Sequence, residues 1–342
     1  ADTTYTVRFP QRQWDESAYA QAVVDRFQAR NLTIAPPSYW IWGYLERFVY
    51  SMEEPFHAPD LLTDHVIRHR LAREGVKVSL SGIGGDELFA GYGYYRFLRV
   101  MDLRRQGLRW HAAWELLRSS ETTPLRVISQ SLLNKLFMLF GHRHEAVSSG
   151  FMSQAIAGYS QCELQPLPES CDERLLADLS HTLLHYWLRA GDKSSMAVPI
   201  EVRYPFLDHR LIEFACRLPV DFLIRHGWLK WLLRKAMVGK LPHDVIWRRQ
   251  KMGFPFPISE WLKAAVSDLK LIFDEMDNPY LSRSFWTSRL SDVVHNHPWF
   301  VWRALSFELW HRSFIRQMPM LPSALAEQIE ASRQRMEPML TS

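Results

Sequence analysis

Cysteine is scarce in this chain of 342 residues. Its three cysteines, Cys162, Cys171 and Cys216, are too few and too widely spaced for a disulfide framework, so we expect a reducing compartment, the cytoplasm. Long apolar runs are lacking as well. The nearest candidate, residues 132–140, is interrupted by an asparagine and a lysine and is far shorter than a membrane span. We therefore expect no membrane partner.

A marked excess of charge of one sign is also absent. The chain has 41 Lys and Arg against 37 Asp and Glu, a formal net charge of +4. Without a basic stripe interleaved with aromatic residues, we expect no nucleic-acid partner. Serine and cysteine nucleophile motifs are absent too. Two histidine pairs, His65/His69 and His181/His185, have the i,i+4 spacing of metal ligands. No third ligand follows either pair, so we expect ordinary histidines on helix surfaces.

The order of sequence patterns predicts an α/β fold. Strand-like runs and amphipathic helical patterns alternate, with strands expected at residues 5–9, 32–34 and 76–81 and helices at 15–29, 38–51 and 61–73. This alternation predicts a parallel sheet with helices on both faces across residues 1–95. Strand-like runs then disappear, so we expect a mostly helical part at residues 96–320, and residues 321–342 form a polar tail.

The densest motif is a glycine-rich turn at residues 76–92, Val-Lys-Val-Ser-Leu-Ser-Gly-Ile-Gly-Gly-Asp-Glu-Leu-Phe-Ala-Gly-Tyr. Its beginning reads as a buried strand with Val78 and Leu80 inward, and its glycines can present backbone N–H groups to an anion. Asp86 and Glu87 follow at once. Carboxylates beside a phosphate repel it unless a cation such as Mg²⁺ lies between them. The motif indicates Mg-nucleotide binding, although a plain strand-to-helix turn with a capping aspartate stays open.

A second dense block covers residues 192–209. Pro205 breaks a helix there, and Asp208 can cap the next one. Glu201 and Arg203 flank a single valine, so an extended backbone would place both side chains on one face as an ion pair. Such a pair can also do no more than brace this corner of the chain.

A third block collects cations. Lys230 and Arg234 are four residues apart, which predicts one shared helix face, and an anion opposite them would relieve their repulsion. A solvated basic face is the alternative. Arg249 and Lys251 add further cations just before a glycine.

These blocks, in this order, resemble the synthetase domain of glutamine-hydrolysing asparagine synthases. The likeness runs from Val7 to about Leu262. Four family motifs fall in register: Ser-Gly-x-Gly-x-Asp-Glu-x-x-x-Gly-Tyr at residues 81–92, Ser-Met-Ala…Glu-x-Arg-x-Pro-Phe-Leu-Asp at 195–208, Lys-x-x-Leu-Arg at 230–234 and Arg-x-Lys-x-Gly-Phe at 249–254. The resemblance implies an adenine nucleotide α-hydrolase-like fold of the PP-loop ATP pyrophosphatase type, as one synthetase domain over residues 1–320.

The resemblance also implies a reaction. ATP and aspartate would form β-aspartyl-AMP and pyrophosphate, and ammonia released from glutamine would then give asparagine. Asp86 would bind Mg²⁺, and Lys230 would be the catalytic residue that steadies developing negative charge. The implied ATP-binding residues are Val7, Ser81, Gly82, Gly84, Arg249 and Lys251.

Two family parts are not found in this sequence. The pyrophosphate-binding loop Ser-Gly-Gly-x-Asp-Ser would lie just before Tyr5, together with the first strand, and the glutaminase domain begins with a cysteine where this chain has Ala1. We therefore expect a fragment that is inactive alone and whose partner in the intact protein is an N-terminal glutaminase domain. A homodimer stays open.

Two further positions depart from the family pattern. Ile83 stands where many members have an acid or a glutamine, and Ala190-Gly191 stands where a Tyr-Glu pair is common. Isoleucine cannot move a proton. These changes leave two alternatives open. One is a related amidotransferase or cyclase, resembling β-lactam synthetases, lasso-peptide cyclases or polysaccharide-biosynthesis enzymes and acting on another carboxylate. The other is a catalytically dead binding module.

Overall fold

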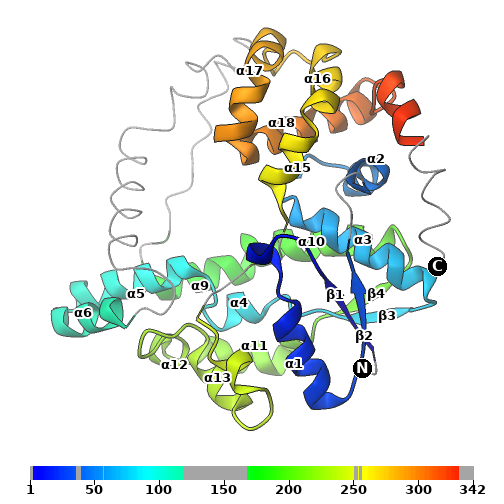
Figure 1. Cartoon of the computed structure of the whole chain (residues 1–342). Helices are drawn as coiled ribbons and strands as arrows, with labels where there is room; N and C mark the ends of the chain where they lie inside the picture. The colour runs from blue at the N-terminus through cyan, green and yellow to red at the C-terminus, as the bar shows by residue number, and fades with distance from the viewer. Residues whose placement is uncertain are drawn as a thin grey trace.

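The computed structural model describes residues 3–35, 40–56, 58–118, 168, 170–249, 253 and 256–330 (Figure 1). The strands are β1 (Thr3–Val7), β2 (Arg30–Ile34), β3 (Val78–Leu80) and β4 (Glu201–Arg203). The helices of the first half are α1 (Ser17–Phe27), α2 (Trp40–Met52), α3 (Asp60–Arg73), α4 (Gly85–Leu88), α5 (Gly93–Arg105) and α6 (Arg109–Leu117). Those of the second half are α9 (Cys171–Ser180), α10 (Leu183–Met196), α11 (His209–Cys216), α12 (Val220–Leu223), α13 (Trp231–Met237), α14 (His243–Ile246), α15 (Ile258–Ala264), α16 (Val266–Asp274), α17 (Arg283–Asn296) and α18 (Pro298–Trp310). Short 3-10 turns, η1 (Arg12–Trp14) and η3 (Pro205–Leu207), and a π-helical turn, η4 (His311–Ile315), complete the described elements.

The strands pair in parallel, as predicted, but within the described residues they form two separate pairs. β1 lies beside β2, with Thr3 opposite Arg30 and Val7 opposite Ile34. β3 lies beside β4, with Ser79 opposite Val202. The prediction that strands end near residue 95 is therefore wrong. β4 escapes a sequence pattern because it is only three residues long and two of them are charged.

β3 is not the buried strand that its sequence predicts. Val78 is 42% exposed and Leu80 is 63% exposed. Both side chains line a cavity that β1 also borders, so the apolar face of β3 lacks a covering layer among the described residues. An apolar alternation indicates which face a strand offers for burial, but a neighbour must be present to bury it.

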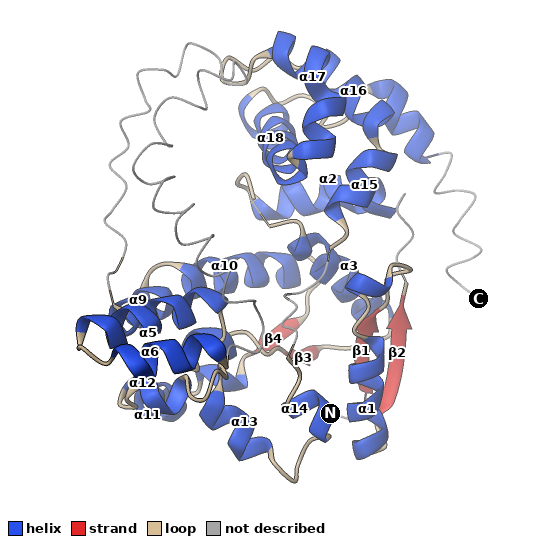
Figure 2. Ribbon diagram, turned by 60° about the vertical axis from the view of Figure 1, so that its left-hand side comes forward, coloured by secondary structure: helices blue, strands red, loops and turns tan. Residues whose placement is uncertain are grey.

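Helices cover the strand pairs from more than one side (Figures 1 and 2). α1 contacts both β1 and β2, and α10 contacts β4 and α3. Leu71 of α3 forms a small buried cluster with Val198 and Ile200, and Tyr5 of β1 packs against it. The strand pairs are thereby joined to the α3–α10 layer through shared side chains.

The C-terminal helices form the largest core together with α2. Trp286 and Trp302 are fully buried there, and Phe48 of α2 belongs to the same cluster. Each large apolar side chain buried in this way contributes about 1.5–3 kcal/mol. Figure 2 shows α2 among α15, α16, α17 and α18 rather than against the strands that precede and follow it in sequence. Among the described residues, no helix combines the length and apolar character needed to cross a membrane.

Candidate functional site

The glycine-rich turn begins where β3 ends and leads directly into α4. Gly84 has φ +95°, and a Cβ on it would lie 2.5 Å from Cδ2 of Leu207. Glycine is therefore required both by the left-handed backbone and by the close approach of η3. The turn of the first motif thus packs against the Pro-Phe-Leu segment of the second.

Some of the backbone N–H groups of this turn already donate hydrogen bonds within the chain. Ser81 N–H donates to the Arg203 carbonyl of β4 at 3.0 Å. Ile83 N–H donates to Ser81 Oγ at 3.4 Å, and Gly85 N–H donates to the Gly82 carbonyl at 3.3 Å. The turn therefore offers fewer N–H groups to an anion than its glycine content predicts.

Asp86 and Lys230 meet beside the turn. Lys230 Nζ lies 3.1 Å from Asp86 Oδ1, although the two residues are far apart in sequence. Lys230 is the N-cap residue of α13 and has a left-handed backbone with φ +55°. Its side chain therefore does not lie on the face of the helix that follows. Gly91 makes this approach possible, because a Cβ there would clash with both Asp86 Oδ1 and Lys230 Cε. The structure thus brings together the expected metal-binding and catalytic residues.

Arg234 does not share a face with Lys230, so the predicted pair of cations opposite one anion is wrong. The Arg234 guanidinium donates to the carbonyl of Leu229 at 2.8 Å and to that of Ile246. It also lies 5.0 Å from the ring centroid of Trp228. Arg234 therefore ties α13 to the end of α14.

The second motif behaves locally as its sequence predicts. Arg203 Nε donates to Glu201 Oε1 at 2.9 Å on the exposed face of β4, and Asp208 accepts the N–H of Arg210 at the start of α11. The hydrogen bond and charge of Arg203 lower the pKa of Glu201. Both side chains of the pair are exposed and neither lines the cavity described below, so the pair contributes little to the site.

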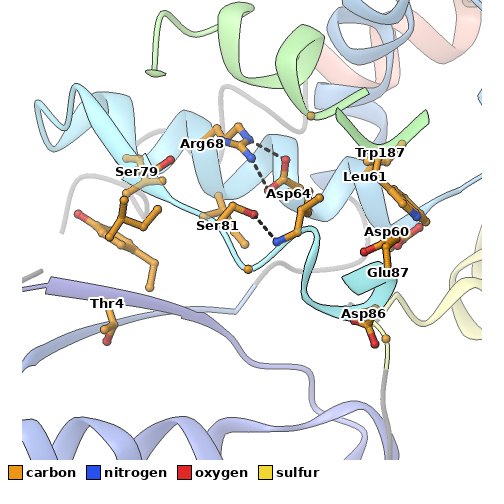
Figure 3. A pocket seen from close by; sticks show the side chains of 18 of the residues that line it. Thr4, Asp60, Leu61, Asp64, Arg68, Ser79, Ser81, Asp86, Glu87 and Trp187 are labelled. Atoms are coloured by element: carbon orange, nitrogen blue, oxygen red, sulfur yellow. Dashed lines mark hydrogen bonds and ion pairs between the residues drawn. The ribbon is translucent and has the colours of Figure 1, made fainter. Parts of the chain in front are cut away.

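A cavity of about 1690 Å³ lies between β1, α3 and the β3 turn (Figure 3). Ser81, Gly82 and Asp86 line it, together with Ile83 and Gly191. The other predicted residues lie differently. Val7 is buried at the end of β1, Gly84 contacts Leu207, Lys230 reaches Asp86 from α13, and Arg249 is exposed. Lys251 lies outside the described residues.

One wall of the cavity comes from α3, which no sequence motif singled out. Arg68 is 4% exposed and donates to both carboxylate oxygens of Asp64, at 2.6 and 3.0 Å. Asp60, at the first turn of the same helix, also lines the cavity. Burial raises the pKa of Asp60 to about 6, and the charge of Asp64 adds to this effect. The i,i+4 spacing of Asp64 and Arg68 was the available sequence signal.

The Glu87 carboxylate is buried at the α4 end of the cavity. It is 3% exposed, and the Tyr92 hydroxyl donates to its Oε1 at 2.6 Å. Burial, and then this hydrogen bond, raise the pKa of Tyr92 well above its ordinary value. Tyr92 is thus held as a neutral hydrogen-bond donor. Glu87 accepts its hydrogen bond and forms part of the cavity wall.

Comparison with known proteins identifies the family. A family model described as asparagine synthase matches residues 2–312. The chain belongs to the asparagine synthase family. It is 27% identical over 350 residues to asparagine synthetase (glutamine-hydrolyzing) 1 of Bacillus subtilis, covering 95% of this chain and 54% of that protein. It is 28% identical over 347 residues to the putative asparagine synthetase (glutamine-hydrolyzing) of Mycobacterium tuberculosis H37Rv, covering 91% and 51%. The chain therefore spans about half the length of these curated relatives.

The two departures from the asparagine synthase pattern lie side by side in the cavity wall. A Cβ built on Gly191 would be 3.9 Å from Cδ1 of Ile83 and 3.0 Å from the Tyr204 hydroxyl. That hydroxyl is buried and has no hydrogen-bond partner among the described residues. Burial raises the pKa of Tyr204. Neither of these two positions therefore supplies a carboxylate to the cavity of this asparagine synthase family member.

The histidine prediction is half wrong in this member of the asparagine synthase family. His65 is fully buried, with its Nε2 3.1 Å from Nε2 of His69. Burial lowers the pKa of His65 to about 3 and that of His69 to about 4. His181 and His185 are exposed, as predicted. Within the described part of the chain, neither pair gains the further ligand that a metal site needs.

Proposed function

We propose that this chain is the ATP-dependent, amide-forming part of a glutamine-dependent asparagine synthetase. The observation that carries this proposal is the meeting of Asp86 and Lys230 beside a glycine turn that borders a large cavity. Family membership supports it, and so do the relatives, which are named as glutamine-hydrolysing asparagine synthetases.

The proposed reaction has two steps. An oxygen of the aspartate side-chain carboxylate attacks the α-phosphorus of ATP, and pyrophosphate leaves. Ammonia then attacks the acyl carbon of β-aspartyl-AMP, and AMP leaves with the bridging oxygen. Lys230, which pairs with Asp86 in this structure, would steady the negative charge that develops on the phosphate oxygens. Ser81, Gly82 and the end of β1 at Val7 would hold the adenosine part, and Arg249 and Lys251 the pyrophosphate.

Asp86 fits the role of a single protein ligand for Mg²⁺. The described residues hold no group of three or more His, Cys, Asp or Glu that could bind a metal alone. Mg²⁺ in nucleotide sites is commonly held by one or two carboxylates, with phosphates and water completing its shell. When bound, the ion would neutralise phosphate charge. Lys230 would then move from Asp86 towards the phosphates.

The remaining parts of the reaction would come from sequence outside this chain. Because the chain spans about half of its relatives, we propose that the glutaminase and the main phosphate-binding loop lie in the other half. The cavity between β1 and β3, and the exposed Val78 and Leu80 that border it, are where such a loop and its strand would be accommodated.

Exchange of labelled pyrophosphate into ATP tests the proposal. We expect exchange that depends on L-aspartate in the chain extended at its N-terminus to the length of its relatives, and none in the 342-residue chain. Adding ammonia should convert aspartate to asparagine with release of AMP. Absence of exchange in the extended protein, with folding intact, would refute the proposal, and full turnover by the chain alone would refute its fragment part.

A second candidate is a ligase that acts on another carboxylate. The contact between the Ile83 and Gly191 positions favours it, because an apolar wall replaces two positions that are polar in many family members. Running the same exchange assay with a panel of carboxylic acids distinguishes the two. Nucleotide binding without exchange for any acid would instead indicate a binding module.

A further inference from the structure

Asp60 differs from the other acids of the cavity. Four acidic residues line the cavity, and three of them have a partner within the described residues. The partnered acids are Asp64 with Arg68, Asp86 with Lys230, and Glu87 with the hydroxyl of Tyr92. In the part of the chain that the structure describes, no Lys, Arg or His forms an ion pair with Asp60.

The surroundings of Asp60 make its charge costly. Burial is the main cause of its raised pKa, about 6, and the nearby charge of Asp64 adds to it. The backbone N–H groups of Asp60 and Leu61 offset only part of this effect. Arg68 is committed to Asp64 and does not compensate. A half-buried carboxylate without a counter-ion weakens the fold, which is typical of a binding or catalytic position.

Among the described residues, no other side chain of the cavity offers a free carboxylate to a cation. Leu61 and Trp187 line the same cavity, and in the view of Figure 3 they overlap with Asp60 and Glu87. Ile83 and Gly191, which also line the cavity, contribute no charge. Asp86 and Glu87 border the cavity too, but each already has a partner. A positively charged group entering this part of the cavity would therefore find Asp60 as its available carboxylate.

We propose that Asp60 binds the ammonium group of the acceptor substrate, so that the site selects an amino acid over a plain dicarboxylic acid. This inference rests on the proposed function, since it assumes that the cavity receives the carboxylate substrate. Asp60 is then a specificity-determining residue: an ion pair formed away from bulk water is stronger than one at the surface. The ammonium group supplies the counter-ion that the folded chain lacks.

Comparing L-aspartate with succinate tests the inference, because succinate is aspartate without its amino group. Binding to the 342-residue chain is measured by isothermal titration calorimetry. The wild-type chain should bind aspartate at least about tenfold more tightly than succinate. In Asp60→Asn this preference should vanish through loss of aspartate affinity, while succinate affinity is unchanged or higher. Glu308→Gln is the matched control: this carboxyl is also buried with a raised pKa, but it lies in the C-terminal core, and its replacement should leave the preference intact.

The pH profile provides a second readout. An ammonium group favours ionised Asp60, so aspartate affinity in the wild type should weaken as the pH falls through about 6, and in Asp60→Asn it should be flat there. The groups around Asp60 that could also titrate are Asp64, Asp86 and Glu87, and the succinate profile corrects for them. Circular dichroism and a second variant, Asp60→Ser, guard against misfolding.

Each outcome is decisive. Equal binding of aspartate and succinate by the wild type, or equal weakening of both by Asp60→Asn, overturns the inference and leaves the proposed function standing. Failure of the wild type to bind either acid overturns the inference alone, because the proposed function is decided by pyrophosphate exchange in the extended protein.

Discussion

Replacing Asp60 by Asn should stabilise the folded chain at neutral pH. The pKa of this carboxyl rises from 3.8 to about 6 on folding, mainly through burial. Between these values the unfolded chain releases a proton that the folded chain retains, so stability falls as the pH rises from about 4 to about 6. Above pH 6 the whole cost is present. A shift of about 2 units corresponds to about 3 kcal/mol.

The expected gain in unfolding free energy is smaller than the roughly 3 kcal/mol to which the pKa shift corresponds. Asp60 is only partly buried by solvent accessibility, so water screens some of the cost, and we expect Asp60→Asn to gain about 1–2 kcal/mol at pH 8. Urea unfolding followed by circular dichroism measures the difference at pH 8, 6 and 4. The gain should shrink as the pH falls through 6 and vanish near 4.

Asp64→Asn is the matched control, and it should change the unfolding free energy in the opposite direction. It lies one helical turn further along α3 and removes the carboxylate that accepts both hydrogen bonds of Arg68. Leaving a guanidinium that is 4% exposed without its partner should cost about 3–5 kcal/mol across this pH range. Loss of stability in Asp60→Asn, or a gain that does not depend on pH, would refute the assignment of burial cost to Asp60.

Three further outcomes are expected. Lys230→Ala should abolish pyrophosphate exchange in the extended protein and change the unfolding free energy by about 1 kcal/mol or less, because solvent reaches both partners of its ion pair with Asp86, at 27% and 29% exposure. Equal loss of exchange and stability would show that the lysine is structural. Gly227→Ala should lower the unfolding free energy in urea by well over about 1 kcal/mol, because φ is +76° there and the new Cβ would clash with a backbone carbonyl. Gly239→Ala, with φ +81° and open space around it, should lower it by only about 1 kcal/mol. Similar losses of unfolding free energy in the two variants would argue against the clash. His69→Asn should make the loss of stability between pH 6.5 and about 4 shallower, because His65 and His69 stay neutral in the fold while the unfolded chain takes up protons; an unchanged acid limb would contradict this.

The local features of the chain could be predicted from its sequence. α1, α2 and α3 lie within about two residues of the helices expected from periodicity. Asp208 caps α11, and Glu201 and Arg203 pair on one face of a strand. Each of these depends on residues that are close in sequence, so spacing alone contains the information.

The rest depends on chain segments that meet only in three dimensions. No local pattern shows that β4 will pair with β3, or that Lys230 will leave its helix face through a left-handed backbone. Arg234 contacts carbonyls that become neighbours only after folding. Asp60 is conspicuous only once the partners of the other cavity acids are known. The family motifs predict the turn, whereas the acidic wall that α3 contributes is defined only by the folded chain.

The position of α2 has a consequence for how the chain is made. This helix is synthesised more than 200 residues before most of its partners, because its apolar face belongs to a core built by α15 to α18. Just after α2, the Phe56 N–H donates to the hydroxyl of Ser306, a partner 250 residues further on. Until those late helices leave the ribosome, Phe48 and its neighbours have no native surface to cover them. We therefore expect chaperones to bind the nascent chain. Premature termination would release a product that aggregates through its exposed apolar surface.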